Sequence, residues 1–187
     1  MCRGFRKPLV VFSPKSLLRH PQVISDLKEF EPGNRFAPVI DERKPDTIKA
    51  PADIDRVLLC SGKVYYELLK WREDNKVNNI AIVTLEQIAP FPFELIQGIS
   101  KKYAKAELVW VQEEPQNMGA WSYVEPRFAT ALLSLNQKRI SYVGRNPAAS
   151  PATGNGTIHL AEIEQFMKAA FDLSPAPDRM PAIRWKY

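Results

Sequence analysis

Short, almost uninterrupted apolar runs alternate with longer segments of helical period from residue 56 onward. Strands that are apolar at nearly every position are typical of a parallel sheet covered by helices on both faces. The apolar runs that predict such strands cover residues 56–60, 80–84, 106–111 and 139–143. The helices are expected over residues 63–75, 93–103, 119–135 and 157–171. The alternation therefore predicts an α/β fold with three layers, α/β/α, and a mostly parallel sheet of about five strands.

The N-terminal third is less regular. Residues 8–13 form an apolar run that ends at Pro14 and predicts a buried strand, and residues 36–40 predict a second, short one. Between residues 41 and 55 the charges and prolines indicate a surface loop. From residue 174 the chain is rich in proline and has no clear period. We expect one domain over residues 1–173 and a proline-rich tail over residues 174–187, which suits a chain of 187 residues.

Composition excludes several classes of protein. Two cysteines cannot build a disulfide scaffold, and the two histidines, His20 and His159, leave no set of ligands with zinc-site spacing. No apolar stretch approaches the ~20 residues that span a bilayer. The net charge is a mild +5, and aromatic residues are not interleaved as in an RNA-binding sheet. We therefore expect no metal site, no nucleic-acid partner and no membrane partner.

Polar residues follow several of the predicted strands, where open parallel sheets usually bind ligands. Lys63, in a Ser-Gly-Lys turn at a helix start, can bind an anion or can belong to a plain turn. The adjacent pair Glu113 and Glu114 can do acid–base chemistry, or one carboxylate can hydrogen-bond a loop. No glycine-rich nucleotide fingerprint, phosphate loop or nucleophile elbow is present. The residues alone therefore describe no complete catalytic constellation.

A basic cluster lies around the first apolar run. Lys15, Arg19 and His20, with Arg6 and Lys7, can hold a phosphate or an acidic partner, or can form a solvated surface. Elsewhere, Cys60 ends a predicted strand and is expected to be an inert buried thiol. His159 is expected to be a packed or surface histidine.

Five segments, in the same order, resemble the C-terminal domain of the thiamine-dependent component of 2-oxoglutarate dehydrogenase. They are RKPLVVFSPKSLLRHP (6–21), LLCSGKVYYEL (58–68), LEQIAPFPFELI (85–96), VWVQEEPQNMGAWSYVEPR (109–127) and GRNPAASPATGNGTIHL (144–160). The resemblance spans roughly residues 5–173. It implies a fold like that of the transketolase C-terminal domain.

The resemblance also implies a function for a longer protein. The family enzyme decarboxylates 2-oxoglutarate in the tricarboxylic acid cycle and passes a succinyl group to the lipoyl arm of a partner acyltransferase. Its thiamine diphosphate and magnesium are bound by upstream domains, and their Gly-Asp-Gly motif is absent from this sequence. We therefore expect no catalytic residue and no cofactor in this chain. The implied partners are those upstream domains, a homodimer mate, the acyltransferase and the dihydrolipoyl dehydrogenase of the complex.

Two sets of site residues come from the resemblance. Some family members bind AMP or acetyl-CoA as an effector, and the matching segment supplies Lys15 and Arg19 as candidate phosphate contacts. A second set is expected at the interdomain or dimer surface. It consists of Gln112, Glu113, Asn117, Gly119 and Arg145.

Three alternatives stay open. The chain can be the same domain of a 2-oxoadipate dehydrogenase, a self-standing nucleotide-binding α/β module that uses Lys15 and Arg19, or a small enzyme that uses Lys63 or the two adjacent glutamates. The resemblance implies the mitochondrial matrix for a eukaryotic source and the cytoplasm for a bacterial one.

Overall fold

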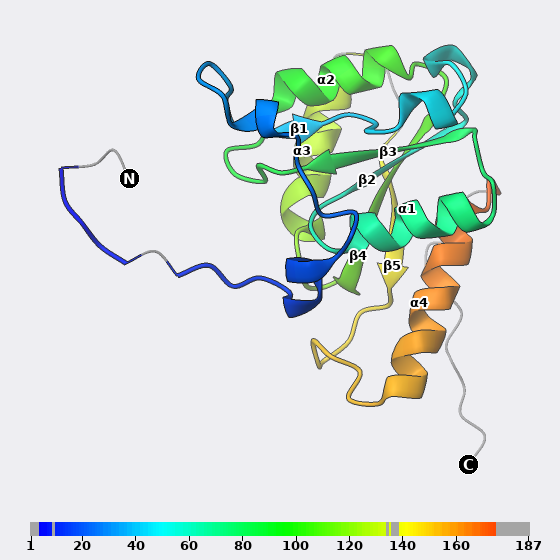
Figure 1. Ribbon diagram of the computed structural model, residues 1–187. Helices are drawn as coiled ribbons and strands as arrows, with labels where there is room; N and C mark the ends of the chain where they lie inside the picture. The colour runs from blue at the N-terminus through cyan, green and yellow to red at the C-terminus, as the bar shows by residue number, and fades with distance from the viewer. Residues whose placement is uncertain (1–3, 9, 134, 136–138, 175–187) are drawn as a thin grey trace. The chain divides into compact units, whose positions relative to one another are not determined.

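The computed structural model describes residues 4–8, 10–133, 135 and 139–174 (Figure 1). The chain divides into two compact units, Met1–Arg35 and Phe36–Tyr187. The expected single domain over residues 1–173 stays a prediction.

The unit Phe36–Tyr187 is built on a five-stranded sheet in the order β1-β3-β2-β4-β5. Strand β1 runs antiparallel to β3, and the other neighbours are parallel. The strands are β1 (Val39–Ile40), β2 (Arg56–Cys60), β3 (Ile80–Leu85), β4 (Glu107–Pro115) and β5 (Ser141–Arg145).

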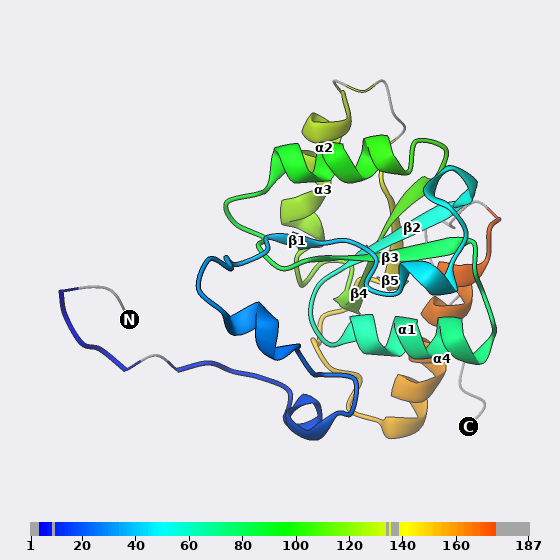
Figure 2. The same ribbon diagram turned by 45° about the horizontal axis from the view of Figure 1, so that its top comes forward.

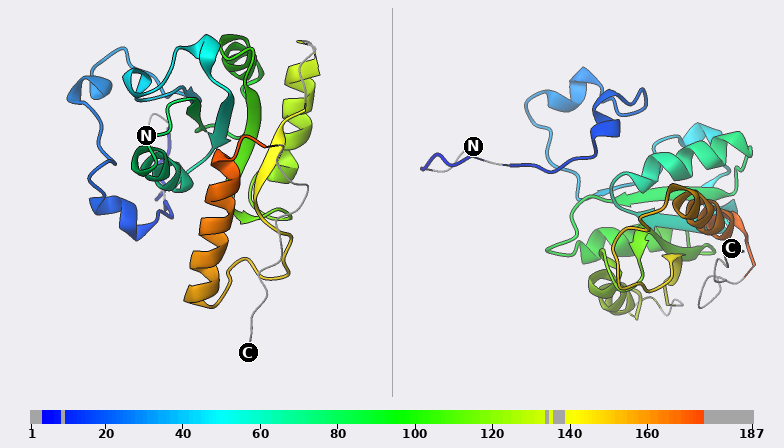
Figure 3. Two further views of the ribbon diagram at one scale, coloured as in Figure 1. Left: turned by 90° about the vertical axis from the view of Figure 1, so that its right-hand side faces the viewer. Right: turned by 90° about the horizontal axis from the view of Figure 1, so that it is seen from below.

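Four α-helices cover the two faces of this sheet (Figures 1 and 2). They are α1 (Val64–Asp74), α2 (Phe93–Lys102), α3 (Trp121–Leu133) and α4 (Gly156–Phe171). Helices α2 and α3 pack on one face, and α1 and α4 pack on the other. Figure 3 shows α4, in orange, alongside β5. The predicted three-layer α/β/α fold is confirmed.

The core is divided between the two faces because successive side chains of a strand point in opposite directions. Along β2, Val57 and Leu59 join the cluster under α2 and α3, whereas Leu58 and Cys60 join the cluster under α1 and α4. All four side chains are completely buried. The same alternation in β3 and β4 explains why the strands are apolar throughout.

A buried ion pair fixes the segment before β2. The Arg72 guanidinium on α1 donates to both carboxylate oxygens of Glu42, at 2.6 and 2.9 Å, and both side chains are 2% exposed. The same carboxylate accepts a hydrogen bond from the amide of Ile82, at 2.9 Å, beyond the point where β1 pairs with β3. Ile54 is also buried. Most residues of the surface loop expected over residues 41–55 are exposed, but the segment is anchored in the core at two side chains, Glu42 and Ile54.

A second buried arginine closes the end of α4. Arg56 is fully buried, and its Nε and Nη2 donate to the Glu107 carboxylate at 2.9 and 2.6 Å. Its Nη1 donates to the carbonyls of Ala169 and Ala170, at 3.1 and 3.0 Å. These are carbonyls of the last helical turn, which have no partner within the helix itself.

The unit Met1–Arg35 contains two short 3-10 helices, η1 (Lys15–Arg19) and η2 (Leu27–Phe30), and neither contains a buried residue. No described residue between 8 and 13 is in a strand. The strand predicted there is wrong for this chain, because the apolar run has no neighbouring strand with which to form a ladder.

No described helix is long and apolar enough to cross a bilayer.

Candidate functional site

The parallel strands β2 to β5 end at one edge of the sheet, the carboxyl edge. Strand β2 leads to β3 on one side, while β4 lies on its other side, so the connections diverge between β2 and β4. Open α/β sheets usually bind ligands at this divergence. The loops that follow β2, β4 and β5 are therefore the first place to look for a site.

An ion pair lies between β2 and β4, at the point where the connections diverge. Lys63, in the turn after β2, pairs with Glu113 at the end of β4, with Nζ and Oε2 3.2 Å apart, and also with Glu67 one helical turn away. Burial acts to lower the pKa of the Lys63 ammonium, but the hydrogen bonds and charges of the two glutamates raise it above its ordinary value. The lysine is therefore held as a cation with two counter-charges. This arrangement supports neither a free anion site nor a neutral lysine nucleophile.

Gln112 is the hub of the loop that follows β4. Its side chain is 3% exposed, and its Oε1 accepts from the indole of Trp110 at 3.0 Å and from the amide of Trp121 at 3.1 Å. Its Nε2 donates to the carbonyls of Pro115 and Met118, at 3.0 and 2.8 Å. A buried amide with both ends satisfied fixes the loop's path from strand to helix.

Gly119 completes that turn. Its φ of +64° lies in the left-handed region that glycine adopts without a steric penalty. A Cβ at this position would lie 3.1 Å from both Gln112 Oε1 and Glu114 Cβ. The glycine is thus required both by the backbone conformation and by its close approach to the hub.

Asn117 ties the β4 loop to the loop that follows β5. Its Nδ2 donates to the Ala148 carbonyl at 2.9 Å, and its Oδ1 accepts from the Ala148 amide at 3.0 Å. One side chain therefore satisfies both backbone groups of Ala148 and joins the two loops.

Arg145, at the end of β5, ties the same loop to α4. Its Nε lies 2.8 Å from the Glu162 carboxylate, and its Nη1 donates to the Pro151 carbonyl at 3.0 Å. The hydroxyl of Thr153 donates to Glu162 at 2.7 Å. At the helix start, the side chain of Asn155 accepts from the amide of Thr157 at 2.9 Å. Arg145, Glu162 and Thr153 therefore form one connected set of contacts between the loop and α4, and Asn155 caps the helix start separately.

These loops enclose a cavity of about 510 Å³ at the carboxyl edge. Its acidic side is formed by Glu113 and Glu114, and His159 lies on the side of α4. The remaining lining residues are Arg145 and residues 151–156. Among the described residues, no group of three or more histidine, cysteine, aspartate and glutamate side chains is arranged to hold a metal ion.

The structure brings together one of the two predicted sets of site residues. All five lie at the carboxyl edge: Gln112 and Glu113 near the end of β4, Arg145 at the end of β5, and Asn117 and Gly119 in the loop after β4. Their role as an interdomain or dimer surface stays a prediction.

The other set, Lys15 and Arg19, lies on η1 in the unit Met1–Arg35, where both side chains are exposed. Their role as phosphate contacts also stays a prediction.

Cys60 is fully buried as expected, and burial raises the pKa of its thiol well above its ordinary range.

Sequence reasoning missed the partners that hold this edge. Glu162 is separated from Arg145 by 17 positions, so no local pattern points to the pair. The Lys63–Glu67 pair, in contrast, has the spacing of four that neighbouring helical side chains require, and this signal was available in the sequence.

The structure thus defines the class of protein: an α/β domain with a mostly parallel sheet, helices on both faces of that sheet, and interlinked loops at its carboxyl edge. The model of the family described as 2-oxoglutarate dehydrogenase C-terminal matches residues 24–171. The chain belongs to this family, and the relatives that it matches are named as dehydrogenases.

Similar proteins carry the names of two related enzymes. The chain is 47% identical over 168 residues to 2-oxoglutarate dehydrogenase, mitochondrial, of Caenorhabditis elegans, a match to 89% of this chain and 16% of the relative. It is 49% identical over 171 residues to 2-oxoglutarate dehydrogenase-like, mitochondrial, of Xenopus laevis, covering 90% and 16%. It is 47% identical over 173 residues to a probable 2-oxoadipate dehydrogenase complex component E1 homolog of Dictyostelium discoideum, covering 92% and 19%. The chain thus spans less than a fifth of the length of these relatives.

Proposed function

We propose that this chain is the C-terminal assembly and regulatory domain of a thiamine diphosphate-dependent 2-oxoglutarate dehydrogenase component in mitochondria. The complete enzyme would decarboxylate 2-oxoglutarate and succinylate the lipoyl group of its partner acyltransferase. The observation that carries the proposal is the carboxyl edge of the sheet. There, the charged and amide groups engage one another, as Gln112, Lys63 and Arg145 illustrate, and build a surface rather than a reactive centre.

The described residues do not fit thiamine diphosphate with magnesium. A magnesium-bound diphosphate needs a cluster of oxygen ligands, and among the described residues no three histidine, cysteine, aspartate or glutamate side chains are grouped to hold a metal ion. The divergence between β2 and β4, where a cofactor would enter such a sheet, is taken up by the Lys63–Glu113 pair. We therefore assign no chemical step to this chain. Its contribution is to hold other domains and a second subunit in position.

A chimera tests the proposal. This chain replaces the matching 168-residue region of the C. elegans relative, and decarboxylation of 2-oxoglutarate and 2-oxoadipate is measured. We expect the chimera to form a stable oligomer and to keep the activity of the parent. We expect the chain alone, supplied with thiamine diphosphate and magnesium, to turn over neither acid. Turnover by the isolated chain, or a folded chimera that neither assembles nor reacts, would refute the assignment.

The 2-oxoadipate alternative is favoured by one observation, the 47% identity to the Dictyostelium homolog, which equals the identity to the C. elegans enzyme. The same chimera built in the Dictyostelium protein addresses it. If this chain supports both parents equally, substrate choice resides outside the domain, as the family resemblance implies.

The proposed effector site is tested separately. Lys15 and Arg19 are both exposed on η1, and both are cations of the kind that bind phosphate. Calorimetry with AMP and with acetyl-CoA, repeated on Arg19→Ala, measures their contribution. Binding that is equally tight in the variant would remove Arg19 from the site.

A further inference from the structure

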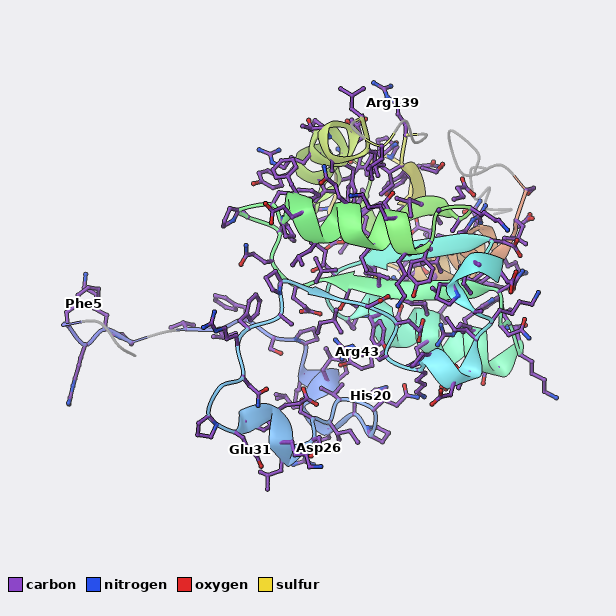
Figure 4. The ribbon with its side chains drawn as sticks, turned by 90° about the horizontal axis from the view of Figure 1, so that it is seen from above. Phe5, His20, Asp26, Glu31, Arg43 and Arg139 are labelled. Atoms are coloured by element: carbon purple, nitrogen blue, oxygen red, sulfur yellow. The ribbon has the colours of Figure 1, made fainter. Side chains whose placement is uncertain are left out.

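The unit Met1–Arg35 is here called the arm, and none of its described residues, 4–8 and 10–35, is buried. Its secondary structure consists of η1 and η2, and neither has a buried residue. Figure 4 marks Asp26 and Glu31, which flank η2, and Phe5 near the start of the arm. A segment that buries no apolar surface within itself is stabilised by packing against something else.

The apolar part of the arm is the stretch 10–13. The side chains of Val10, Val11 and Phe12 are 72%, 73% and 96% exposed. No described residue of this stretch forms a hydrogen bond with another backbone group, and the first such bond of the arm runs from the amide of Leu17 to the carbonyl of Pro14 at 3.0 Å. The stretch therefore offers a row of backbone donors and acceptors beside apolar side chains.

The stretch has the pattern of a strand that is covered on both faces. In an extended chain, Val10 and Phe12 point to one side and Val11 points to the other, so apolar groups occupy both. This chain contains the same pattern in β2, where Val57, Leu58 and Leu59 are completely buried between two helical layers. An equivalent strand added to a solvent-exposed sheet would leave one apolar face in water. The sheet that receives the arm is therefore one with helices on both faces.

Two observations indicate where that sheet lies. The match to the C-terminal family begins at residue 24, so the stretch precedes the region that defines this domain. The relatives are also roughly six times as long as their matched region, which supplies further domains in the same polypeptide. We propose that residues 10–13 pair as a β-strand with the covered sheet of the domain that precedes this one in 2-oxoglutarate dehydrogenases. The inference rests on the proposed function and specifies how the assembly is made.

The charges of the arm indicate a further property of the sheet that receives it. Residues 4–25 contain four basic residues, Arg6, Lys7, Lys15 and Arg19, and no acidic one. These residues lie on both sides of the strand-forming stretch. The sheet that receives it is therefore expected to carry acidic groups near both ends of the added strand, where they would pair with these cations.

The test uses the whole chain and, as its probe, the C. elegans relative lacking the region that this chain matches. Hydrogen exchange is measured at the amides of residues 10–13, with and without the probe. Pairing in a sheet should slow the paired amides by about 100-fold or more. In a strand added at a sheet edge, alternate amides face the neighbouring strand, so Val10→Pro and Val11→Pro are both made, and one of the two removes a ladder donor. That variant should bind the probe about tenfold or more weakly, whereas Val11→Thr keeps a β-branched side chain and the amide and should bind like the wild type. Because η1 and η2 bury nothing, all three variants should keep the urea midpoint of the wild type.

The outcomes separate this inference from the function on which it rests. Protection that requires the probe and is lost in one of the two proline variants supports the arm's role. Equal binding by the wild type and both proline variants overturns it and leaves the assembly function intact. Failure of the wild type to bind the probe overturns both. Protection that is present without the probe and disappears on dilution overturns the proposal too, since the recipient would then be a second copy of the chain.

Discussion

The buried Glu42–Arg72 pair allows the sharpest prediction, the effect of Arg72→Met. The substitution keeps much of the side-chain volume but removes both guanidinium hydrogen bonds, at 2.6 and 2.9 Å, and the cation. The Glu42 carboxylate would then remain buried with only the amides of Ile82 and Lys44 as partners. Breaking a buried pair by removing one member costs about 3–5 kcal/mol.

Urea unfolding, followed by the fluorescence of the buried Trp110, measures this cost. With a urea m-value of about 2 kcal/mol per M, the midpoint should fall by about 1.5–2.5 M. Lys44→Met is the matched control, because Lys44 forms a surface pair with Glu73 in which the side chains are 40% and 39% exposed. Its loss should cost less than about 1 kcal/mol.

The pH dependence supplies an independent check. Burial acts to raise the pKa of the Glu42 carboxyl, but the hydrogen bonds from Arg72 and from the amide of Ile82 outweigh it and leave the pKa below its ordinary value. Stability from this group is therefore present above the unfolded pKa of about 4.3 and is lost as the pH falls through the folded pKa. In Arg72→Met burial prevails, so the carboxyl should gain a proton readily and the gap to wild type should narrow in acid. A loss below about 1 kcal/mol, or a gap that stays constant between pH 7 and pH 4, would refute this account of the pair.

Three further substitutions test other parts of the structure. Gly119→Ala should lower the free energy of unfolding by about 1–3 kcal/mol, because the φ of residue 119 is positive and a Cβ there would press on the Gln112 side chain. Gly98→Ala is the control: residue 98 lies in helix α2 with open space around it, so the variant should be neutral or more stable by up to about 1 kcal/mol. Thermal denaturation measures both effects. Arg56→Lys should lower the free energy of unfolding by about 2 kcal/mol or more, since one ammonium cannot replace a guanidinium that bonds Glu107 and the carbonyls at the end of α4 at once. Amide exchange in that last helical turn should accelerate; unchanged exchange would contradict the capping role. Cys60, in a Cys2→Ser background, should resist an aromatic disulfide reagent at pH 8 until urea unfolds the protein, because burial raises the pKa of its thiol; prompt reaction in the folded state would show that the strand end is open.

Much of the fold followed from the sequence because the strands are apolar on both faces. The runs at 56–60 and 80–84 match β2 and β3 to within one residue. At β4 and β5 the prediction ended too early, at residues 111 and 143. There the strands continue into Gln112 and Arg145, whose polar side chains end an apolar pattern without ending the ladder.

The stretch 8–13 shows the opposite failure. Its composition is that of a buried strand, yet no described residue in it is part of the sheet. Strand propensity measures how well a side chain suits a covered sheet, and it does not reveal which sheet.

The candidate site was predictable in its residues but not in its connections. The motif around residue 112 was visible in the sequence, whereas the Arg145–Glu162 pair and the Asn117–Ala148 link join positions 17 and 31 residues apart. Such contacts are set by how loops meet at a shared sheet edge. Arg43, marked in Figure 4, makes another contact between positions far apart in the sequence: its guanidinium lies 4.8 Å from the centre of the Tyr65 ring on α1.

The carboxylate of Glu42 also covers part of the outer border of the sheet. Strand β1 is two residues long and leaves most of the outer border of β3 without a neighbouring strand. A bare border of this kind recruits strands from other molecules and seeds fibres. By accepting from the amide of Ile82, the Glu42 carboxylate occupies a backbone donor of this border past the end of β1, so an incoming strand from another molecule would find one ladder position already taken.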